Sequence, residues 1–266
     1  MSRFERTQDI GILLLIGTAA TWLMCAPATA AIKPDFTINT KAAEITVAVE
    51  SALKKHPGLA ADCLAEGKRW AEKMRQDADK ERRESPVMFP EGRRWSLERE
   101  YTSRSLVGRY VSILRADYSF TGGAHPNTYV DTILWDRDAR RRISIRPFFK
   151  ESADNGPTMT ALAKLVRAAV AAEKKAREIP LDDDPDKQFA KAIKPQLIGI
   201  GPVSLAPSTL ADKSSGLTFH FSPYAVGAYA EGPYTVFVPW TDLRPYLSAE
   251  GTALFGGDRP AADDNQ

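Results

Sequence analysis

Apolar residues recur with a helical spacing in four segments of the chain. Residues 39–55 and 59–84 place them at i, i+3, i+4 and i+7, which gathers them on one face of a helix. Residues 157–177 repeat this pattern between two prolines, and a shorter helix follows through about residue 194. In the second of these helices, the apolar stripe consists of Leu59, Cys63, Gly67, Trp70 and Met74. The pattern therefore predicts two helices before the middle of the chain and two after it.

Between these helices the pattern changes to a period of two, which is typical of strands. Alternation begins at Trp95 and continues through residues 106–120 and 128–135, and a turn leads to a return strand at 142–145. Because the links are too short for crossovers, we expect an antiparallel meander. Further strands are predicted at 203–210, 217–221 and 234–239, followed by a closing helix at 240–247.

Strands and helices segregate along the chain, which predicts an α+β fold. We expect an antiparallel sheet meander packed against helices, with an N-terminal helical segment. The predicted divisions are a leader (1–30), an N-terminal helical region (31–92), an α+β domain (93–250) and a flexible, acidic tail (251–266).

The leader has the features of a secretory signal peptide. A basic start precedes an apolar run from Ile10 to Met24, and Ala28-Thr29-Ala30 offers the small residues that signal peptidase recognises. The run is shorter than the roughly 20 residues that a membrane span needs. Lipid modification of Cys25 is an alternative, although Met24 before it is not a small residue. We expect cleavage near Ala30, no stable membrane span afterwards, and a periplasmic or secreted location.

Composition narrows the classes of partner. The formal net charge of +2 gives no basic bias that would favour nucleic acid. After the expected cleavage Cys63 is the single remaining cysteine, so no internal disulfide can form. Its place on the apolar side of a predicted helix indicates a buried thiol, and an intermolecular disulfide or a reactive thiol is the alternative.

Local motifs of catalysis and metal binding are missing. A calcium loop starting at Asp182 would need Gly and Glu where Lys187 and Ile193 stand, and Asp184-Pro185 fits a helix N-cap instead. The sequence contains no HExxH, CxxC, GxSxG or P-loop motif. We expect no metal and no cofactor, and we expect His220 on its strand to be at the surface or partly buried. A carboxylate pair for glycoside hydrolysis has no fixed spacing and stays open.

Two loops carry the candidate site residues. The loop Thr121–Asn127 joins two strands, and its paired glycines allow close backbone approach beside an imidazole. The loop Ser222–Pro233 presents two tyrosines among small residues. The alternative is that the glycines serve only a turn and that both rings pack over the sheet end. The candidate ligand-binding residues are Thr121, Gly122, Gly123, His125, Asn127, Tyr224 and Tyr229.

Together the two loops support a family resemblance. The run Tyr118–Asn127, the segment Ile145–Phe149 and the run Phe219–Gly232 occur in an order that resembles the extracytoplasmic domain of the RsiV anti-sigma factor. The same domain accompanies the catalytic domain of the peptidoglycan deacetylase PdaC. The resemblance spans about residues 95–247 and implies an α+β binding module of the cell envelope, with lysozyme as the ligand of the RsiV version. Only nine residues precede the apolar run of this chain, which implies no sigma-binding region.

We therefore expect a non-enzymatic module that binds a cell-wall glycan or a wall-acting protein such as lysozyme. The first alternative is an envelope hydrolase acting on peptidoglycan with His125 as general base. The second is a structural envelope protein without a small ligand.

Overall fold

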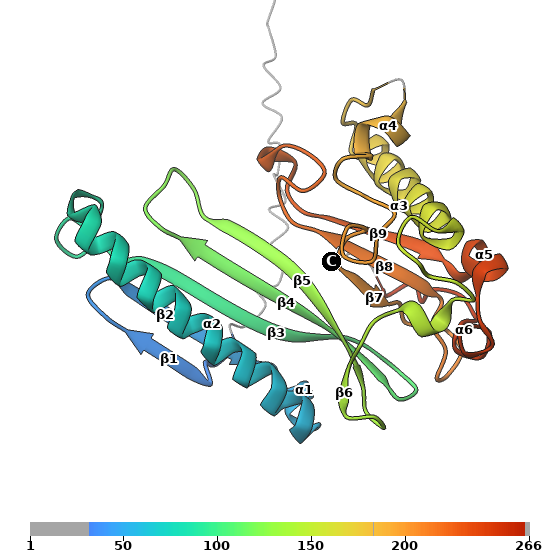
Figure 1. The fold of residues 1–266 in the computed structure, drawn as a ribbon, viewed down its shortest axis with the longest axis horizontal. Coiled ribbons are helices and arrows are strands. Elements are labelled where there is room, and N and C mark those ends of the chain that lie inside the picture. The colour runs from blue at the N-terminus through green and yellow to red at the C-terminus, as the bar shows by residue number, and fades with distance from the viewer. Residues whose placement is uncertain (1–31, 183, 264–266) are drawn as a thin grey trace, which may run out of the picture. The chain divides into compact units, whose positions relative to one another are not determined.

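The predicted α+β class is confirmed by the computed structural model, which describes residues 32–182 and 184–263 (Figure 1). The described residues, from Ile32 onward, belong to one compact unit. The expected signal peptide, its cleavage site and Cys25 lie outside the described residues. Within the described part, no helix combines the length and the apolar character that crossing a membrane requires.

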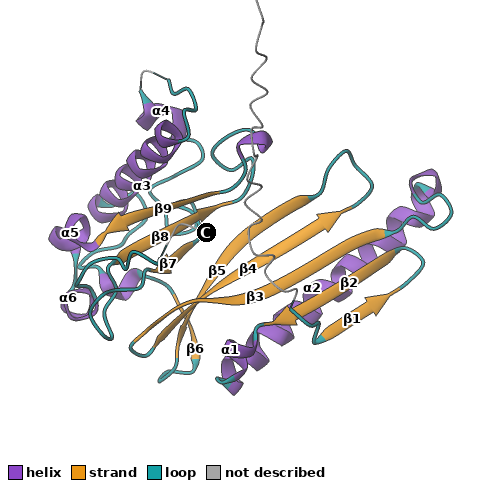
Figure 2. Cartoon of the chain, turned by 180° about the vertical axis from the view of Figure 1, so that it is seen from behind, coloured by secondary structure: helices purple, strands orange, loops and turns teal. Residues whose placement is uncertain are grey.

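A six-stranded sheet forms the first half of this unit, with its strands side by side in sequence order (Figures 1 and 2). The strands are β1 (Phe36–Asn39), β2 (Ala43–Val49), β3 (Trp95–Val107), β4 (Tyr110–Phe120), β5 (Asn127–Asp136) and β6 (Arg141–Ile143). From β3 to β6 all neighbours pair antiparallel, which confirms the meander. The chain turns at Gly108, whose φ is +53°, so residues 106–120 belong to two strands and not to one.

The predicted helix at 39–55 is wrong. Strands β1 and β2 occupy most of this segment, and only α1 (Ser51–Lys54) is helical. The buried residues Ile45, Val47 and Val49 satisfy a period of two, and β-branched side chains favour extended backbone. Strand β2 pairs with β3 in parallel, so the sheet continues across the boundary that we predicted between residues 92 and 93.

A parallel pair needs a crossover, and α2 (Pro57–Glu84) supplies it. The helix lies along one face of the sheet and buries Leu59, Cys63 and Gly67, which confirms this part of the predicted stripe. A Cβ on Gly67 would stand 2.4 Å from Val47 Cγ1, so glycine permits close contact between helix and sheet. Cys63 is fully buried as expected, and burial raises the pKa of its thiol to about 12.

Charged side chains also hold α2 to the sheet. The carboxylate of Glu66 on α2 accepts hydrogen bonds from Arg115 of β4 and Arg142 of β6. Arg99 of β3 forms an ion pair with Asp117 of β4 beside this cluster. Burial alone would raise the pKa of Glu66, but the neighbouring arginines outweigh it and hold that pKa below its usual range.

A second sheet, of three antiparallel strands, follows in the C-terminal half. It consists of β7 (Val203–Leu205), β8 (Gly216–Phe221) and β9 (Tyr234–Pro239), with α3 (Pro157–Ala176) packed against it. The remaining short helices are η1 (Pro86–Met88), η2 (Arg146–Phe148), α4 (Pro185–Phe189), η3 (Tyr229–Glu231), α5 (Trp240–Leu243), η4 (Arg244–Tyr246) and α6 (Ala249–Leu254). The helix at 157–177 and the N-cap role of Asp184 are confirmed, since Asp184 accepts a hydrogen bond from the Lys187 amide.

Polar side chains join the two sheets. The amide of Leu205 on β7 donates to Ser112 Oγ of β4, and Ser105 Oγ of β3 donates to the Leu205 carbonyl. Strand β7 ends at Leu205, earlier than predicted, because Pro207 has no amide to continue the ladder.

Where we predicted a flexible tail from Gly251, the structure has helix α6 and a buried Phe255. Farther on, Asp263 forms ion pairs with Arg104 of β3 and with Arg259. The side chain of Asp263 is 6% exposed, so this end of the described chain packs against the sheet instead of fraying.

Candidate functional site

The loop Thr121–Asn127 connects β4 to β5 at the tip of a long hairpin. Gly122 has a φ of +93°, a conformation that suits glycine, and its nearest neighbour is the Arg93 side chain. Thr121 and Gly123 are exposed, and a Cβ on Gly123 would meet open space. These three residues therefore shape the tip of the hairpin.

His125 follows this tip in the sequence, and its ring contacts two tyrosines of the distant loop Ser222–Pro233. Its ring stacks on Tyr229, with 3.8 Å between the ring centroids and 22° between the planes. The Tyr229 hydroxyl donates to the Pro126 carbonyl at 2.8 Å, and the Tyr224 hydroxyl lies 3.3 Å from His125 Nε2. We call His125, Tyr224 and Tyr229 the aromatic platform.

The hydrogen bonds define the tautomer of the histidine. Nδ1 lies 2.9 Å from the Pro126 carbonyl, which can only accept, so Nδ1 carries the proton. In the neutral ring Nε2 is then the acceptor for the Tyr224 hydroxyl.

The backbone of Tyr224 adopts a left-handed conformation. Its φ is +71°, in the left-handed region that non-glycine residues rarely adopt, and 61% of the residue is exposed. A strained backbone under an exposed aromatic ring is a feature that clusters at binding sites. In this conformation the Tyr224 ring lies beside the Tyr229 ring, and the two ring centroids are 5.3 Å apart.

The loop that carries both tyrosines is anchored to α3. Lys174 Nζ donates to Glu231 Oε2 at 2.5 Å, and the Tyr234 hydroxyl donates to the same oxygen. Burial alone would raise the pKa of Glu231, but these hydrogen bonds outweigh it and lower that pKa to about 2. A Cβ on Gly227 would stand 2.2 Å from Glu231 Oε2, so glycine leaves room for the pair. Arg177 donates further hydrogen bonds to the carbonyls of Glu231 and Pro233.

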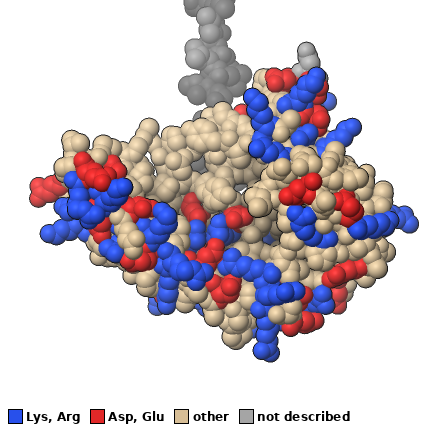
Figure 3. All heavy atoms as spheres, viewed as in Figure 1, with Lys and Arg blue, Asp and Glu red and all other residues tan. Residues whose placement is uncertain are grey.

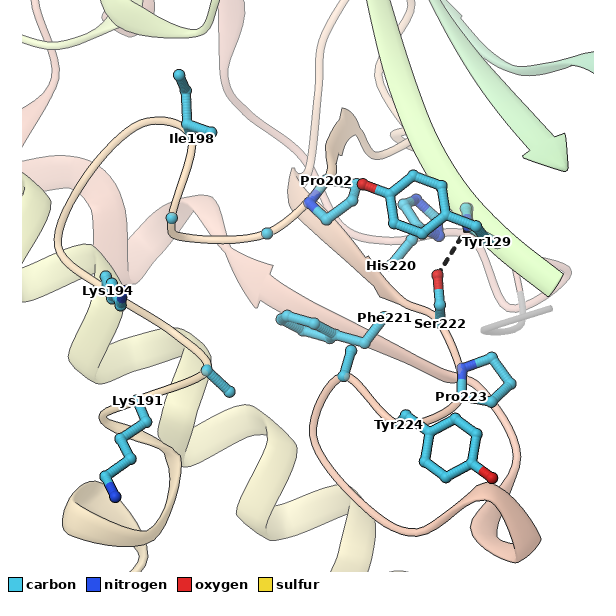
Figure 4. A pocket seen from close by; sticks show the side chains of 15 residues that line it. Tyr129, Lys191, Lys194, Ile198, Pro202, His220, Phe221, Ser222, Pro223 and Tyr224 are labelled. Atoms are coloured by element: carbon cyan, nitrogen blue, oxygen red, sulfur yellow. Dashed lines mark hydrogen bonds between the residues drawn. The ribbon is translucent and has the colours of Figure 1, made fainter. Parts of the chain in front are cut away.

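A groove of about 470 Å³ opens beside Tyr224 (Figure 4). Tyr129 of β5, Pro223 and Tyr224 border one side, and Lys191, Lys194 and Ile198 come from the segment opposite, between α4 and β7. Phe221 lies between these two sides, and Ser222 Oγ accepts a hydrogen bond from the Val130 amide. We call this hollow the Tyr224 groove.

A second hollow of about 480 Å³ borders Tyr224 as well. Trp70 and Met74 of α2 line it together with Asn127. Of the seven residues proposed from the sequence, the structure thus brings His125, Tyr224 and Tyr229 into contact and places Asn127 beside them. Tyr224 lines both hollows and Asn127 lines the second, whereas the other five candidate residues line neither.

Sequence reasoning missed Tyr129, Ile198, Lys191 and Lys194. Tyr129 was recognised only as a strand residue, although 55% of it is exposed. Alternation gave no signal for it, because Tyr129 shares its face of the strand with the buried Ile133 and Trp135. No local pattern marks the two lysines, because only the fold places them opposite the tyrosines.

The prediction for His220 is wrong, since this residue is 3% exposed. Its Nε2 lies 2.9 Å from the buried Ser204 Oγ, and burial lowers its pKa to about 4. The imidazole of this β8 residue therefore stays neutral near pH 7, and its hydrogen-bond partner Ser204 belongs to the neighbouring strand β7. Among the described residues, no three His, Cys, Asp or Glu side chains are arranged to hold a metal ion.

Comparison with known proteins gives a family match for part of the chain. A family model described as "Protein of unknown function (DUF3298)" matches residues 148–241, which include the loop Ser222–Pro233 and both groove lysines. No curated protein matches the chain.

Two solved structures of DUF3298 proteins have a similar fold. The protein from Bacteroides fragilis is 15% identical with a TM-score of 0.51, and the match covers 82% of this chain and 94% of that one. The protein from Pseudomonas aeruginosa is 17% identical with a TM-score of 0.52, covering 85% and 93%. The chain is therefore similar to the DUF3298 family model over residues 148–241 and shares its fold with these two solved proteins.

Proposed function

We propose that this chain is a non-enzymatic binding module of the cell envelope, periplasmic or secreted, whose ligand is a cell-wall glycan. The resemblance to the RsiV and PdaC extracytoplasmic domains suggests the envelope and also names lysozyme as an alternative ligand. The observation that carries the proposal is Tyr224, a tyrosine that is 61% exposed on a left-handed backbone.

An aromatic platform suits a saccharide ligand. A sugar ring has a face of C–H groups that packs on an aromatic ring, while its hydroxyls hydrogen-bond with polar groups at the edge. The stack of His125 on Tyr229 and the hydrogen bond to Tyr224 hold the ring before a ligand arrives. Such preorganisation lowers the entropy cost of binding.

Hydrolysis with His125 as base has weaker support. The ring contacts are the Pro126 carbonyl and two tyrosines, and no carboxylate of the described residues is hydrogen-bonded to it. A histidine base is normally oriented by such an acid and must face the reacting atom. Binding is therefore the function that we propose.

The test is biolayer interferometry of the chain from Ala31 against purified glycan strands and, in parallel, against lysozyme. Tyr224→Ala should weaken glycan binding by about tenfold or more, the loss typical of an exposed aromatic contact. Leu106→Ala removes a similarly exposed apolar side chain on β3 and serves as the control. Binding only to lysozyme would identify the alternative ligand. Release of soluble fragments from isolated wall, abolished by His125→Ala, would replace the proposal with hydrolysis.

A further inference from the structure

Exposed apolar side chains concentrate around the Tyr224 groove. Among the described residues, seven large hydrophobic residues are exposed, and three of them line this groove. They are Tyr129 at 55%, Ile198 at 98% and Tyr224 at 61%. Apolar groups that stay in water cost free energy in the unbound protein, so their gathering around one hollow indicates a contact surface.

The charged lining of the groove has one sign. Of its lining residues, only Lys191 and Lys194 carry a formal charge, and both are exposed. No carboxylate of the described residues lies within 4.0 Å of either ammonium group, whereas nearby Lys187 pairs with Asp184 and Arg167 with Asp186. Two cations thus remain available to a ligand beside the tyrosines.

The surface around the groove also has an uneven distribution of charged side chains. Figure 3 shows a stretch with few charges over the tip of the β4–β5 hairpin and the loop that leads into η3. Charged side chains of both signs gather on α2 and around α4 on either side of it. An anionic group in the groove would therefore meet the lysines without opposing carboxylates in the lining.

The backbone of β5 beside the groove disfavours a peptide ligand that would add a strand. Strand β6 pairs with β5 only at Leu134–Asp136, which leaves the earlier part of that edge without a partner strand. Two amides of this edge are nevertheless occupied, since Val130 donates to Ser222 Oγ and Thr132 donates to Asp131 Oδ1. A peptide that adds a strand here would have to displace both of these hydrogen bonds, so this mode of binding is disfavoured at Val130 and Thr132.

We propose that the Tyr224 groove binds a carboxylate-bearing saccharide chain. Tyr129 and Tyr224 pack on sugar rings, and Lys191 and Lys194 pair with carboxylates on the chain. This inference rests on the proposed function and deepens it, because it states that the glycan must be anionic. Charge-assisted hydrogen bonds at an exposed groove contribute modestly, so the two lysines together should change affinity about tenfold.

The test is isothermal titration calorimetry with two matched probes. The first is the peptide-free tetrasaccharide of alternating N-acetylglucosamine and N-acetylmuramic acid, whose lactyl groups carry carboxylates. The second is chitotetraose, which has the same β-1,4 backbone of N-acetylhexosamines without those groups. The carboxylated probe should bind about tenfold more tightly, and rising salt should reduce this difference because salt screens exposed charges.

Variants assign the difference to the groove. The double variant Lys191→Gln/Lys194→Gln should bind both probes with the affinity that the native chain has for chitotetraose. Lys55→Gln/Lys164→Gln removes the same charge at two exposed positions outside the groove and should retain the preference. Tyr129→Ala should weaken the binding of both probes by the same factor, since it removes a packing contact and no charge.

The outcomes separate this inference from the proposed function. Equal affinity for the two probes, both lost in Tyr224→Ala, would overturn the anionic requirement and leave glycan binding intact. Binding to neither probe would overturn both proposals. Binding to an acidic peptide such as tetraglutamate without binding to either sugar would overturn the saccharide assignment and retain only the cationic groove.

Discussion

Lys174 and Glu231 lie 57 positions apart, yet the ammonium group of one donates to the carboxylate of the other at 2.5 Å. The lysine residue is 3% exposed, and its charge also faces the rings of Phe189 and Tyr234. This pair connects α3 to the loop that presents Tyr224 and Tyr229. The geometry of the aromatic platform therefore depends on a contact outside it.

Replacing Lys174 with Ala should reduce the free energy of unfolding by about 2–3 kcal/mol. A fully buried pair broken on one side costs more, but the Glu231 side chain is 19% exposed and gains some hydration. Lys175→Ala changes an exposed neighbour and is the matched control. Urea unfolding of both variants measures the difference. Equal stability of the two would show that the ion pair does not hold the loop.

The same pair predicts a pH dependence of stability. The pKa of Glu231 lies at about 2, below its ordinary value of 4.5, so the folded state favours the carboxylate. Its contribution is present above about pH 4.5 and is lost as the pH falls towards 2. The difference in unfolding free energy between the native chain and Glu231→Gln should therefore shrink across this interval. Glu178→Gln removes the same charge at an exposed carboxylate without an ion pair among the described residues and is the matched control.

The left-handed backbone of Tyr224 gives a prediction that is independent of any ligand. Alanine and glycine both remove the ring, but only glycine tolerates a φ of +71° without strain. Tyr224→Gly should be more stable than Tyr224→Ala by about 1 kcal/mol, measured by thermal and urea unfolding. Equal stability would mean that the loop relaxes to another conformation when the ring is lost. Tyr224→Ala itself should unfold at nearly the native temperature, because the ring is exposed.

Gly67 should resist the substitution that normally stabilises a helix. Alanine is favoured over glycine by about 1 kcal/mol in helices, but its Cβ would meet Val47 Cγ1 at 2.4 Å. Gly67→Ala should therefore destabilise the protein by about 1–3 kcal/mol through overpacking. Adding Val47→Ala should recover part of that loss, which a double-mutant cycle measures. Gly58→Ala, near the start of the same helix with no atom closer than 3.9 Å, should be neutral or stabilising.

Much of the fold was predictable because its signals are local. The stripe of α2 and the proline that starts α3 each lie within one segment, and the meander from β3 to β6 needs only short links. The same kind of evidence failed at residues 39–55, because Ile45 and Val49 suit a helical face and a strand face equally well. Pairing with β3, more than 40 residues away, decided between them.

The candidate site shows the same division. The composition of the two loops identified His125, Tyr224 and Tyr229. Paired glycines beside a histidine, and tyrosines among small residues, are recognisable as candidate binding residues from the loop sequence alone. The contacts of His125 and Pro126 with these tyrosines join residues 99 and 103 positions apart, so they were not available from either loop alone. Lys191 and Lys194 carried no signal, because an exposed lysine in a sequence resembles any other.

By itself, the sequence determined the helices α2 and α3, the antiparallel meander, the α+β class and the two loops of interest. Those features depend on side-chain periodicity and turn chemistry over a few residues. Only the tertiary structure decided the identity of β2, the burial of His220 and the meeting of Tyr224, Tyr129 and the two lysines at one groove. Such contacts depend on which distant surfaces pack together, and that packing is a property of the whole chain.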